Sequence, residues 1–330
     1  MLKKKEQLLV IDPLGEIGHL RFVNRTIEIL SKDYDIVFVS SSTFCSRVVK
    51  ASKYVDLNDV LFSYSGKYVF VIKQILILLY LYIKIIPSYR NTKVLFVGCE
   101  NISFSLVWRN SKDTFLLLHN NIDKKGLSRY FFRRISRSVR LLVFENYILD
   151  YLKDIMKNKI FVVPHPLLKG AEMNKLEDNI TYKNSILLLN VGGDSEYLDE
   201  ILSFAEMNNM NAYIKSSADL SYISSNHVQV SDYIEDYYSL LFNSVAVFIN
   251  APYNYRISGV FIECMSMGKQ IFFLNREGLY SQNMHQNYPS NVLNNLNMIQ
   301  KNYSDTVNLI FKQLHSDENI FNCYQNVFLN

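Results

Sequence analysis

A chain of 330 residues with 49% hydrophobic and 20% charged residues is long enough for two domains and too apolar to be disordered. Its net charge of +4 hides an asymmetry: residues 1–165 carry 26 Lys and Arg against 14 Asp and Glu, whereas residues 166–330 carry 9 against 17. The basic half is expected to meet an anionic partner, either nucleic acid or a membrane surface.

The cysteines and the amino terminus indicate a cytoplasmic protein. The four cysteines are far apart and form no C-x-x-C pair, which argues against a zinc site or a disulfide framework and fits a reducing compartment. No signal peptide is expected, because the apolar run Leu8–Ile11 is short and leads into Asp12-Pro13.

Apolar strands alternate with helices through the first half of the chain. The expected strands are Gln7–Asp12, Asp35–Ser40, Lys93–Gly98, Thr114–His119, Arg140–Phe144 and Ile160–Val163. A helix is expected from about His19 to Ser31, and a second, very apolar one over Val69–Ile86. Continuous apolar strands between helices predict a parallel sheet covered on both faces.

The same pattern restarts after the polar stretch Pro166–Asn184. Expected strands are Ser185–Gly193, Asn211–Ile214, His227–Val230, Val245–Ile249 and Gln270–Leu274, and expected helices include Glu196–Met207, Asn291–Gln300, Tyr303–His315 and Glu318–Leu329. The sequence therefore predicts an α/β protein of two Rossmann-like, doubly wound domains facing across a cleft. The expected boundaries are 1–168, a linker at 169–182, a second domain at 183–310, and a C-terminal helix at 311–330 that packs back on the first domain.

The segment Ser231–Gly268 has the pattern of a nucleotide site. A turn and an amphipathic helix precede the strand Val245–Ile249, and Ser258-Gly259 then opens a second helix that carries a single acid, Glu263. The amino end of a helix that follows a parallel strand has free backbone N–H groups suited to phosphate. An acid one turn further in can accept hydrogen bonds from ribose hydroxyls.

This segment resembles the nucleotide-sugar-binding region of GT-B glycosyltransferases, in particular the large retaining family, glycosyltransferase family 4, of bacterial polysaccharide biosynthesis. The family has a Glu, seven residues, a second Glu, a Met- or Ala-rich helix, Gly, and Lys or Pro before a strand. Glu263 matches the second Glu, and Met265–Lys269 followed by Gln270–Leu274 matches the continuation. The first Glu, which in the family contacts the donor sugar, is absent, and Tyr255 stands at its position eight residues before Glu263.

The catalytic candidates of the first half are Glu16, His19 and His119. The first two lie with Gly15 in the loop after the first strand, where the resemblance implies a Gly-containing loop that faces the donor diphosphate and the acceptor. In an inverting enzyme, Glu16 or His19 would be the general base for the acceptor hydroxyl. The alternative for Glu16 is a structural one, charge and capping at the amino terminus of the following helix. His119 ends a buried strand, where the resemblance implies contact with the donor sugar.

The second half supplies the remaining donor-binding candidates. Gly192 and Gly193 end its first strand and permit close approach of a phosphate. Lys215 and Arg256 are the basic residues expected to neutralise the diphosphate of the leaving group. The resemblance implies that the nucleotide base packs near Tyr233 and Ile234. The full donor-binding set is Gly15, Gly192, Gly193, Lys215, Tyr233, Ile234, Tyr255, Arg256, Ser258, Gly259 and Glu263.

A basic and aromatic run at residues 124–140 favours a membrane surface. Its expected membrane-binding residues are Lys124, Lys125, Arg129, Arg133, Arg134 and Arg137. A solvated surface helix has the same composition. The helix Val69–Ile86 has only ten uncharged residues between Lys73 and Lys84, which is too short to span a bilayer. It is expected to be buried or to lie at the interface.

Together these features predict a metal-independent glycosyltransferase, peripheral on the inner face of the cell membrane, in capsule, O-antigen or exopolysaccharide biosynthesis. It would need no cofactor and would transfer a sugar from a nucleotide diphosphate sugar to a hydroxyl of a glycan or lipid-linked acceptor. Three alternatives stay open: a non-catalytic GT-B-like partner subunit, a nucleic-acid-binding protein, and an epimerase of the same two-domain shape. No recognition helix or other nucleic-acid-binding pattern accompanies the basic run.

Overall fold

The computed structural model describes residues 5–63, 66–109, 113–167, 182–192, 197–220, 222–223, 225–300 and 308–329. The chain forms two compact units: Met1–Pro166 together with His315–Asn330, and Leu167–Leu314. The expected linker at 169–182 falls almost entirely outside the described residues.

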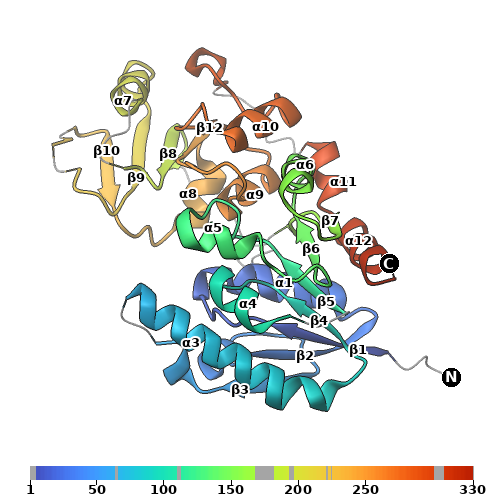
Figure 1. The fold of residues 1–330 in the computed structure, drawn as a ribbon. Coiled ribbons are helices and arrows are strands. Elements are labelled where there is room, and N and C mark those ends of the chain that lie inside the picture. Colours follow the sequence, from blue (N-terminus) through green and yellow to red (C-terminus); the bar gives the residue numbers. More distant parts are fainter. Residues whose placement is uncertain are drawn as a thin grey trace. The chain divides into compact units, whose positions relative to one another are not determined.

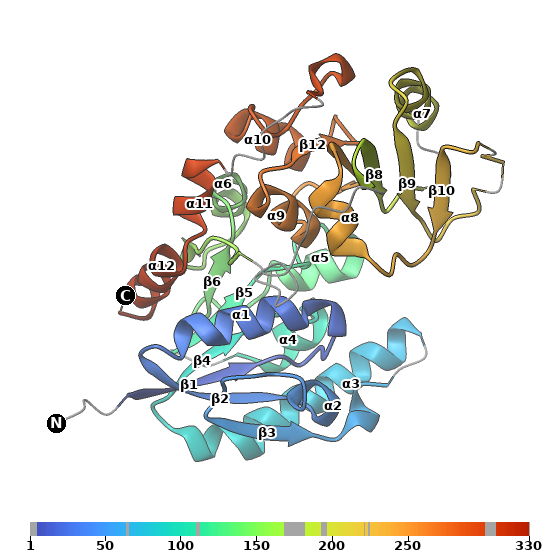
Figure 2. The ribbon, with the colours of Figure 1, turned by 180° about the vertical axis from the view of Figure 1, so that it is seen from behind.

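The first unit is built on a seven-stranded parallel sheet of order β3-β2-β1-β4-β5-β6-β7. Its strands are β1 (Glu6–Ile11), β2 (Tyr34–Ser41), β3 (Lys53–Leu57), β4 (Lys93–Phe96), β5 (Thr114–Leu117), β6 (Arg140–Val143) and β7 (Ile160–Val162). Its helices are α1 (Leu20–Leu30), α2 (Ser42–Cys45), α3 (Lys67–Tyr80), α4 (Asn101–Val107), α5 (Gly126–Phe132), α6 (Asn146–Ile155) and α12 (Asp317–Leu329). Helices α3 and α4 cover one face of the sheet and α1 the other (Figures 1 and 2). The last helix, α12, returns to this unit, where Asp317 pairs with the buried Arg25 of α1.

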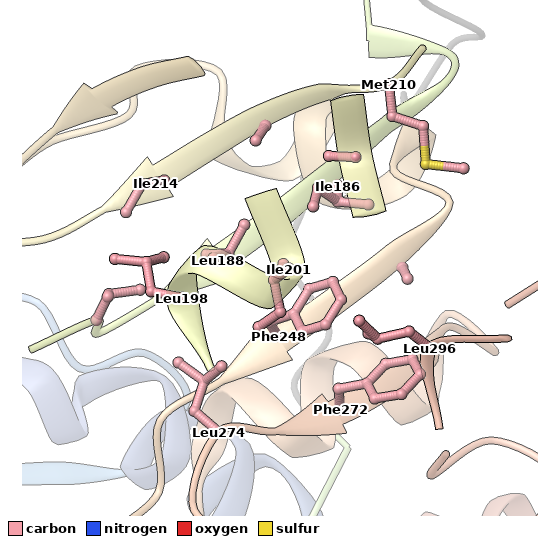
Figure 3. Packing of buried hydrophobic residues seen from close by; sticks show 14 of the residues in the cluster. Ile186, Leu188, Leu198, Ile201, Met210, Ile214, Phe248, Phe272, Leu274 and Leu296 are labelled. Atoms are coloured by element: carbon pink, nitrogen blue, oxygen red, sulfur yellow. The ribbon is translucent and has the colours of Figure 1, made fainter. Parts of the chain in front are cut away.

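The second unit has a five-stranded parallel sheet of order β10-β9-β8-β11-β12. Its strands are β8 (Ser185–Leu189), β9 (Asn211–Lys215), β10 (Val228–Ser231), β11 (Ala246–Ile249) and β12 (Gln270–Phe273). Its helices are α7 (Leu198–Met207), α8 (Tyr237–Asn243), α9 (Gly259–Ser266), α10 (Leu279–Asn287) and α11 (Leu309–Leu314). Leu198 and Ile201 of α7 pack against the strand residues Leu188, Phe248 and Phe272 in one core (Figure 3).

Every strand expected from the sequence is present, and the prediction of two doubly wound α/β domains is confirmed. The sequence patterns missed the edge strand β3, whose side chains are mostly exposed, and the helix α10. The helix expected at Asn291–Gln300 is wrong. Val292 pairs with Ile271 of β12 instead, and only Leu296–Met298 forms a 3-10 turn. The asparagines of this stretch explain the difference, since Asn295 Oδ1 accepts a hydrogen bond from the N–H of Asn297 rather than leaving the backbone to a helix.

In both sheets the strand order reverses between a central pair, which is β1 and β4 in the first unit and β8 and β11 in the second. Ligands of open α/β sheets bind beyond the carboxyl ends of the strands at this reversal. A functional site is therefore expected at the carboxyl edge of each sheet.

Candidate functional site

Three histidines meet at the carboxyl edge of the first sheet. His119 follows β5, His165 follows β7, and His19 lies in the 3-10 turn before α1. The ring of His119 is 4.7 Å from that of His19 and 6.1 Å from that of His165, measured between centroids. Phe22 and Phe144 pack against His119 and leave it 9% exposed. The structure thus brings together two of the three expected catalytic residues, His119 and His19, and holds the His119 ring in a fixed position.

The third expected catalytic residue, Glu16, lies beside His19, with Oε2 3.7 Å from Nε2 of the imidazole. Glu16 precedes the turn Ile17–His19 but its side chain makes no capping hydrogen bond, so capping does not account for this acid. It instead lines a small pocket of about 100 Å³ that Phe70, Asn120 and Lys124 also line. A sugar hydroxyl in this pocket would have a carboxylate within reach.

Asp12 is a site residue that the sequence analysis did not single out. It directly follows β1, and its Oδ1 accepts hydrogen bonds from the N–H groups of Leu14 at 2.9 Å and Gly15 at 3.2 Å. Burial raises the pKa of Asp12, and the charge of nearby His19 acts in the opposite direction. A carboxylate close to His19 stabilises a protonated imidazole, the arrangement needed if His19 takes a proton from a substrate.

The position of Gly15 requires glycine, because of both its backbone conformation and its neighbouring side chains. Its φ is +61°, and a Cβ added there would lie 2.7 Å from Cδ1 of Phe62. A Cβ at Gly18 would have no heavy atom within 4 Å. Of the two glycines in this loop, Gly15 therefore sets the turn that places Glu16 and His19.

Glu145 is a second acid that the sequence analysis missed. It follows β6 at the same edge of the sheet, is 8% exposed, and has a pKa raised to about 7 by burial. A carboxyl group with this pKa exchanges protons readily near neutral pH. In the sequence, the position of Glu145 after a strand is also that of an ordinary helix cap. Only its burial in the folded chain identifies it as a candidate site residue.

His165, the third histidine at this edge, is buried against its own chain. Its Nδ1 lies 2.8 Å from the carbonyl oxygen of Pro166, and its own carbonyl oxygen lies 2.6 Å from Nδ1 of His315. Burial lowers the pKa of His165 to about 3 and that of His315 to about 4. Both rings are therefore neutral near pH 7.

In the second unit, Glu263 is buried on α9 with both carboxylate oxygens oriented. The Tyr237 hydroxyl donates to Oε2 at 3.1 Å, and the Tyr238 hydroxyl donates to Oε1 at 3.0 Å. Ser258 caps the helix by accepting a hydrogen bond from the N–H of Phe261 at 3.3 Å. Since α9 follows β11, its amino end lies at the reversal of the strand order, as the nucleotide-site pattern requires.

Lys215 lies in the same neighbourhood as Glu263. It ends β9, and its ammonium lies 5.6 Å from the centre of the Tyr237 ring whose hydroxyl binds Glu263. Arg256 lies in the loop before α9, exposed, with its guanidinium 5.1 Å from the ring centre of Tyr253. Tyr255 is half-buried in this loop. Of the expected donor-binding residues, Arg256 thus lies in the loop before α9, Glu263 lies within α9, and Lys215 is connected to Glu263 through Tyr237.

The other expected donor-binding residues are less constrained. Tyr233 and Ile234 line a pocket of about 310 Å³ together with Tyr213 of β9. Gly192 follows β8 beside the strand reversal, but a Cβ there would meet nothing within 4 Å, so no contact of the described residues requires glycine. Gly193 lies outside the described residues.

The expected basic membrane helix is shorter than its composition suggests. Helix α5 covers Gly126–Phe132, so Lys124 and Lys125 precede it and Arg133, Arg134 and Arg137 follow it. Arg129 alone of the expected set lies within α5, where it donates to the Tyr151 hydroxyl at 3.0 Å. The basic run therefore does not form one continuous amphipathic helix.

Within the described parts of the chain, no three His, Cys, Asp or Glu side chains are grouped so that they would hold a metal ion.

No protein-family model and no curated protein sequence matches the chain. Solved structures match it over nearly its whole length. UDP-N-acetylglucosamine 2-epimerase from Rickettsia bellii matches at a TM-score of 0.63 and 9% identity, covering 99% of this chain and 96% of its own. Anabaena HepE, solved with UDP and glucose, matches at 0.59 and 10%, covering 98% and 99%. A glycosyltransferase from Rickettsia africae matches at 0.58 and 14%, covering 99% and 98%. The chain has the GT-B fold of two Rossmann-like domains.

Proposed function

We propose that this protein is a metal-independent glycosyltransferase that moves a sugar from a nucleotide diphosphate sugar to a hydroxyl of a glycan or lipid-linked acceptor in surface polysaccharide biosynthesis. The observation that carries the proposal is the buried, doubly hydrogen-bonded Glu263 one turn into α9, at the strand reversal of a GT-B second domain. The kinship to family 4 rests on the sequence motif around this residue.

The second unit would bind the donor. The N–H groups at the start of α9 and the cations of Lys215 and Arg256 would hold the diphosphate, and Glu263 would accept hydrogen bonds from the ribose. The departing nucleoside diphosphate gains negative charge as the sugar–phosphate bond breaks, so these groups stabilise the transition state as well as the bound donor. Tyr233 and Ile234 would contact the base.

The first unit would supply the proton chemistry. As the acceptor oxygen bonds to the anomeric carbon, its proton must pass to a base, and Glu16 and His19 are the candidates. Asp12 would stabilise His19 once it is protonated, and His119 would contact the donor sugar. Direct displacement with His19 or Glu16 as base gives a product of inverted anomeric configuration, whereas kinship to the retaining family 4 predicts a retained one, and the product's configuration decides between the two.

An exposed apolar helix face supports action at a membrane surface. Over residues Lys67–Tyr89, the first unit has a helical stretch long and apolar enough to cross a membrane by length and composition, and only 22% of its most apolar window is buried. Ile72, Leu76, Leu79 and Ile83 repeat every three or four residues and are all exposed. Lys73 and Lys84 interrupt this apolar stretch, so we expect its exposed side chains to enter the bilayer interface instead of the helix spanning the bilayer. Phe70 at its beginning lines the pocket that contains Glu16, which fits a lipid-linked acceptor.

Thermal-shift measurements with UDP, GDP, CDP and dTDP test the proposed function, because a ligand that binds only the folded state raises the melting temperature. The nucleotide that stabilises the protein then identifies the sugar donors to assay for transfer, with the anomeric configuration of the product read by NMR. Absence of any shift would refute the nucleotide site. A shift without transfer or hydrolysis of any matching nucleotide sugar would indicate a non-catalytic partner subunit.

Vesicle co-sedimentation tests the membrane part separately. Replacing Ile72 and Ile83 of the exposed helical face by serine should reduce pelleting with anionic vesicles. Leu309→Ser with Ile310→Ser, a somewhat more exposed apolar pair on α11, is the control. Equal loss in both variants would contradict a role for this face.

A nucleotide-sugar epimerase is the second candidate function. It is favoured by the fold match to UDP-N-acetylglucosamine 2-epimerase together with Asp12 and Glu145, two buried acids with raised pKa values at the edge of the first sheet. An epimerase converts its nucleotide sugar without any acceptor, whereas a transferase releases nucleoside diphosphate in proportion to acceptor. Following both products in one NMR assay distinguishes the two activities.

A further inference from the structure

A basic pocket lies at the amino edge of the first sheet, opposite the edge that carries the candidate site. It has a volume of about 630 Å³ and is lined where α4, α5 and α6 end and the chain turns into the next strand. Five of its lining residues are basic: Arg109, Arg133, Arg134, Arg137 and Lys157. None of the lining residues that the structure describes is acidic.

The floor of this pocket is fixed by side-chain hydrogen bonds between the three turns. The Ser136 hydroxyl donates to the carbonyl oxygen of Arg109 at 2.6 Å. Asn158 donates from Nδ2 to the carbonyl oxygens of Ser136 and Val139, both at 2.8 Å. Ile135 is buried beneath them. These hydrogen bonds tie the loop that carries Arg133, Arg134 and Arg137 to the two neighbouring turns.

Within the described parts of the chain, the charges of the pocket have no carboxylate partners. Among the described residues, none of the five cations forms an ion pair. Arg134 stacks its guanidinium 4.2 Å from the ring centre of Tyr130, and Arg109 donates from Nε to the carbonyl oxygen of Leu106. Neither contact neutralises a charge. Like charges gathered in one concave site raise the local concentration of anions and favour a multivalent one.

The arginine content of the pocket narrows the chemical class of its ligand further. Guanidinium groups bind phosphate oxygens through paired, charge-assisted hydrogen bonds, and four of the five cations are arginines. The volume is within the range of pockets that hold small molecules. The geometry points to a binding site for a diphosphate-bearing ligand at this edge, separate from the proposed donor site.

Two sources of such a phosphate ligand fit the surroundings. Trp108, next to Arg109, contacts Tyr82 ring to ring at 5.7 Å, and Tyr82 is exposed on the apolar stretch Lys67–Tyr89. This contact places the apolar stretch that we expect at a membrane close to the end of α4, which borders the pocket, so a lipid phosphate could be presented there. A soluble nucleotide or polyphosphate offers the same chemistry from solution.

Calorimetry with inorganic pyrophosphate at low salt tests the pocket. The titration is done in a Lys215→Ala/Arg256→Ala background, which removes the cations of the proposed donor site, so the result does not depend on the proposed function. In this background, Arg133→Ala/Arg137→Ala/Lys157→Ala should weaken binding by about tenfold or more, since each lost contact is charge-assisted. The control Lys32→Ala/Arg47→Ala/Lys159→Ala removes three exposed cations that do not line the pocket, Lys159 lying only two residues from Lys157. It should weaken binding by less than about threefold.

The result that would overturn the proposal is equal weakening in both triple variants, or no measurable pyrophosphate binding before the pocket is altered. Circular dichroism of each variant shows whether it is folded. The variant Arg133→Lys/Arg137→Lys retains the charge, so it should bind pyrophosphate more tightly than the alanine variant of the pocket. Co-sedimentation with vesicles of phosphatidylglycerol and phosphatidylcholine distinguishes a lipid phosphate from a soluble one. Pelleting that is lost in the pocket variant and competed by pyrophosphate identifies a lipid phosphate. Unchanged pelleting with lost pyrophosphate affinity identifies a soluble one.

Discussion

Replacing Glu263 by alanine tests whether this residue binds a ligand or only ties two helices together. The substitution removes the acceptor of the Tyr237 and Tyr238 hydroxyl bonds, at 3.1 and 3.0 Å, that join α8 to α9. Both tyrosines are partly exposed and can bond to water instead, so the free energy of unfolding should fall by only about 1–3 kcal/mol. If Glu263 also holds the ribose, the donor loses charge-assisted hydrogen bonds worth roughly 1.5–3 kcal/mol, and its affinity falls at least about tenfold.

The variant Tyr237→Phe/Tyr238→Phe separates these effects. It removes the same two hydrogen bonds but keeps the carboxylate of Glu263 and both aromatic rings, including the ring beside Lys215. Urea unfolding should show comparable destabilisation in the tyrosine variant and in Glu263→Ala. Calorimetry with the nucleotide found by thermal shift should show the large affinity loss only in Glu263→Ala. Equal nucleotide affinity in the two variants would refute the assignment of Glu263 to the ribose.

Three further predictions concern the first unit. Gly15→Ala should lower the free energy of unfolding by about 1–3 kcal/mol, because it combines a left-handed φ of +61° with a contact at 2.7 Å to Phe62, whereas Gly18→Ala should change it little by urea titration. The pKa of Glu145 is about 7 in the folded chain against an ordinary 4.5, so the folded state keeps a proton that the unfolded state releases. Its contribution to stability should therefore fall by about 3 kcal/mol as pH rises through that interval, and urea titrations of Glu145→Gln should lack this dependence. His119→Phe, which keeps an aromatic ring, should depress turnover with nucleotide affinity intact, and wild-type turnover would leave His119 a packing residue only.

Local patterns were sufficient where one segment carries the whole signal. The strand Val245–Ile249 is uniformly apolar, and the helix after it begins at a capping serine, so the position of Glu263 follows from the sequence alone. The partners of Glu263 do not, because Tyr237 and Tyr238 lie 26 and 25 residues away and reach it only through the packing of α8 on α9.

The acids of the first unit were missed for the same reason. Asp12 and Glu145 each follow a strand, as many turn residues do, and only tertiary burial raises their pKa values. The basic run at 124–140 shows the opposite error. Its composition suggests one amphipathic helix, but α5 ends at Phe132 and the later arginines turn into a pocket whose other walls come from Arg109 and Lys157.

The chemistry of the two sheet edges differs in a way that bears on how they would divide a reaction. At the first, Asp12 and Glu145 have raised pKa values, and Glu16 and His19 lie within 3.7 Å of each other, so this edge is equipped to exchange protons. At the second, Lys215, Arg256 and the amino end of α9 provide positive charge, and Glu263 provides an oriented acceptor. Changes at the first edge should therefore appear in kcat and its pH profile, and changes at the second in the dissociation constant of the nucleotide. If variants at the first edge change kcat and variants at the second change nucleotide affinity, the enzyme uses both edges in one reaction. Group transfer requires both edges, whereas nucleotide binding alone requires only the second.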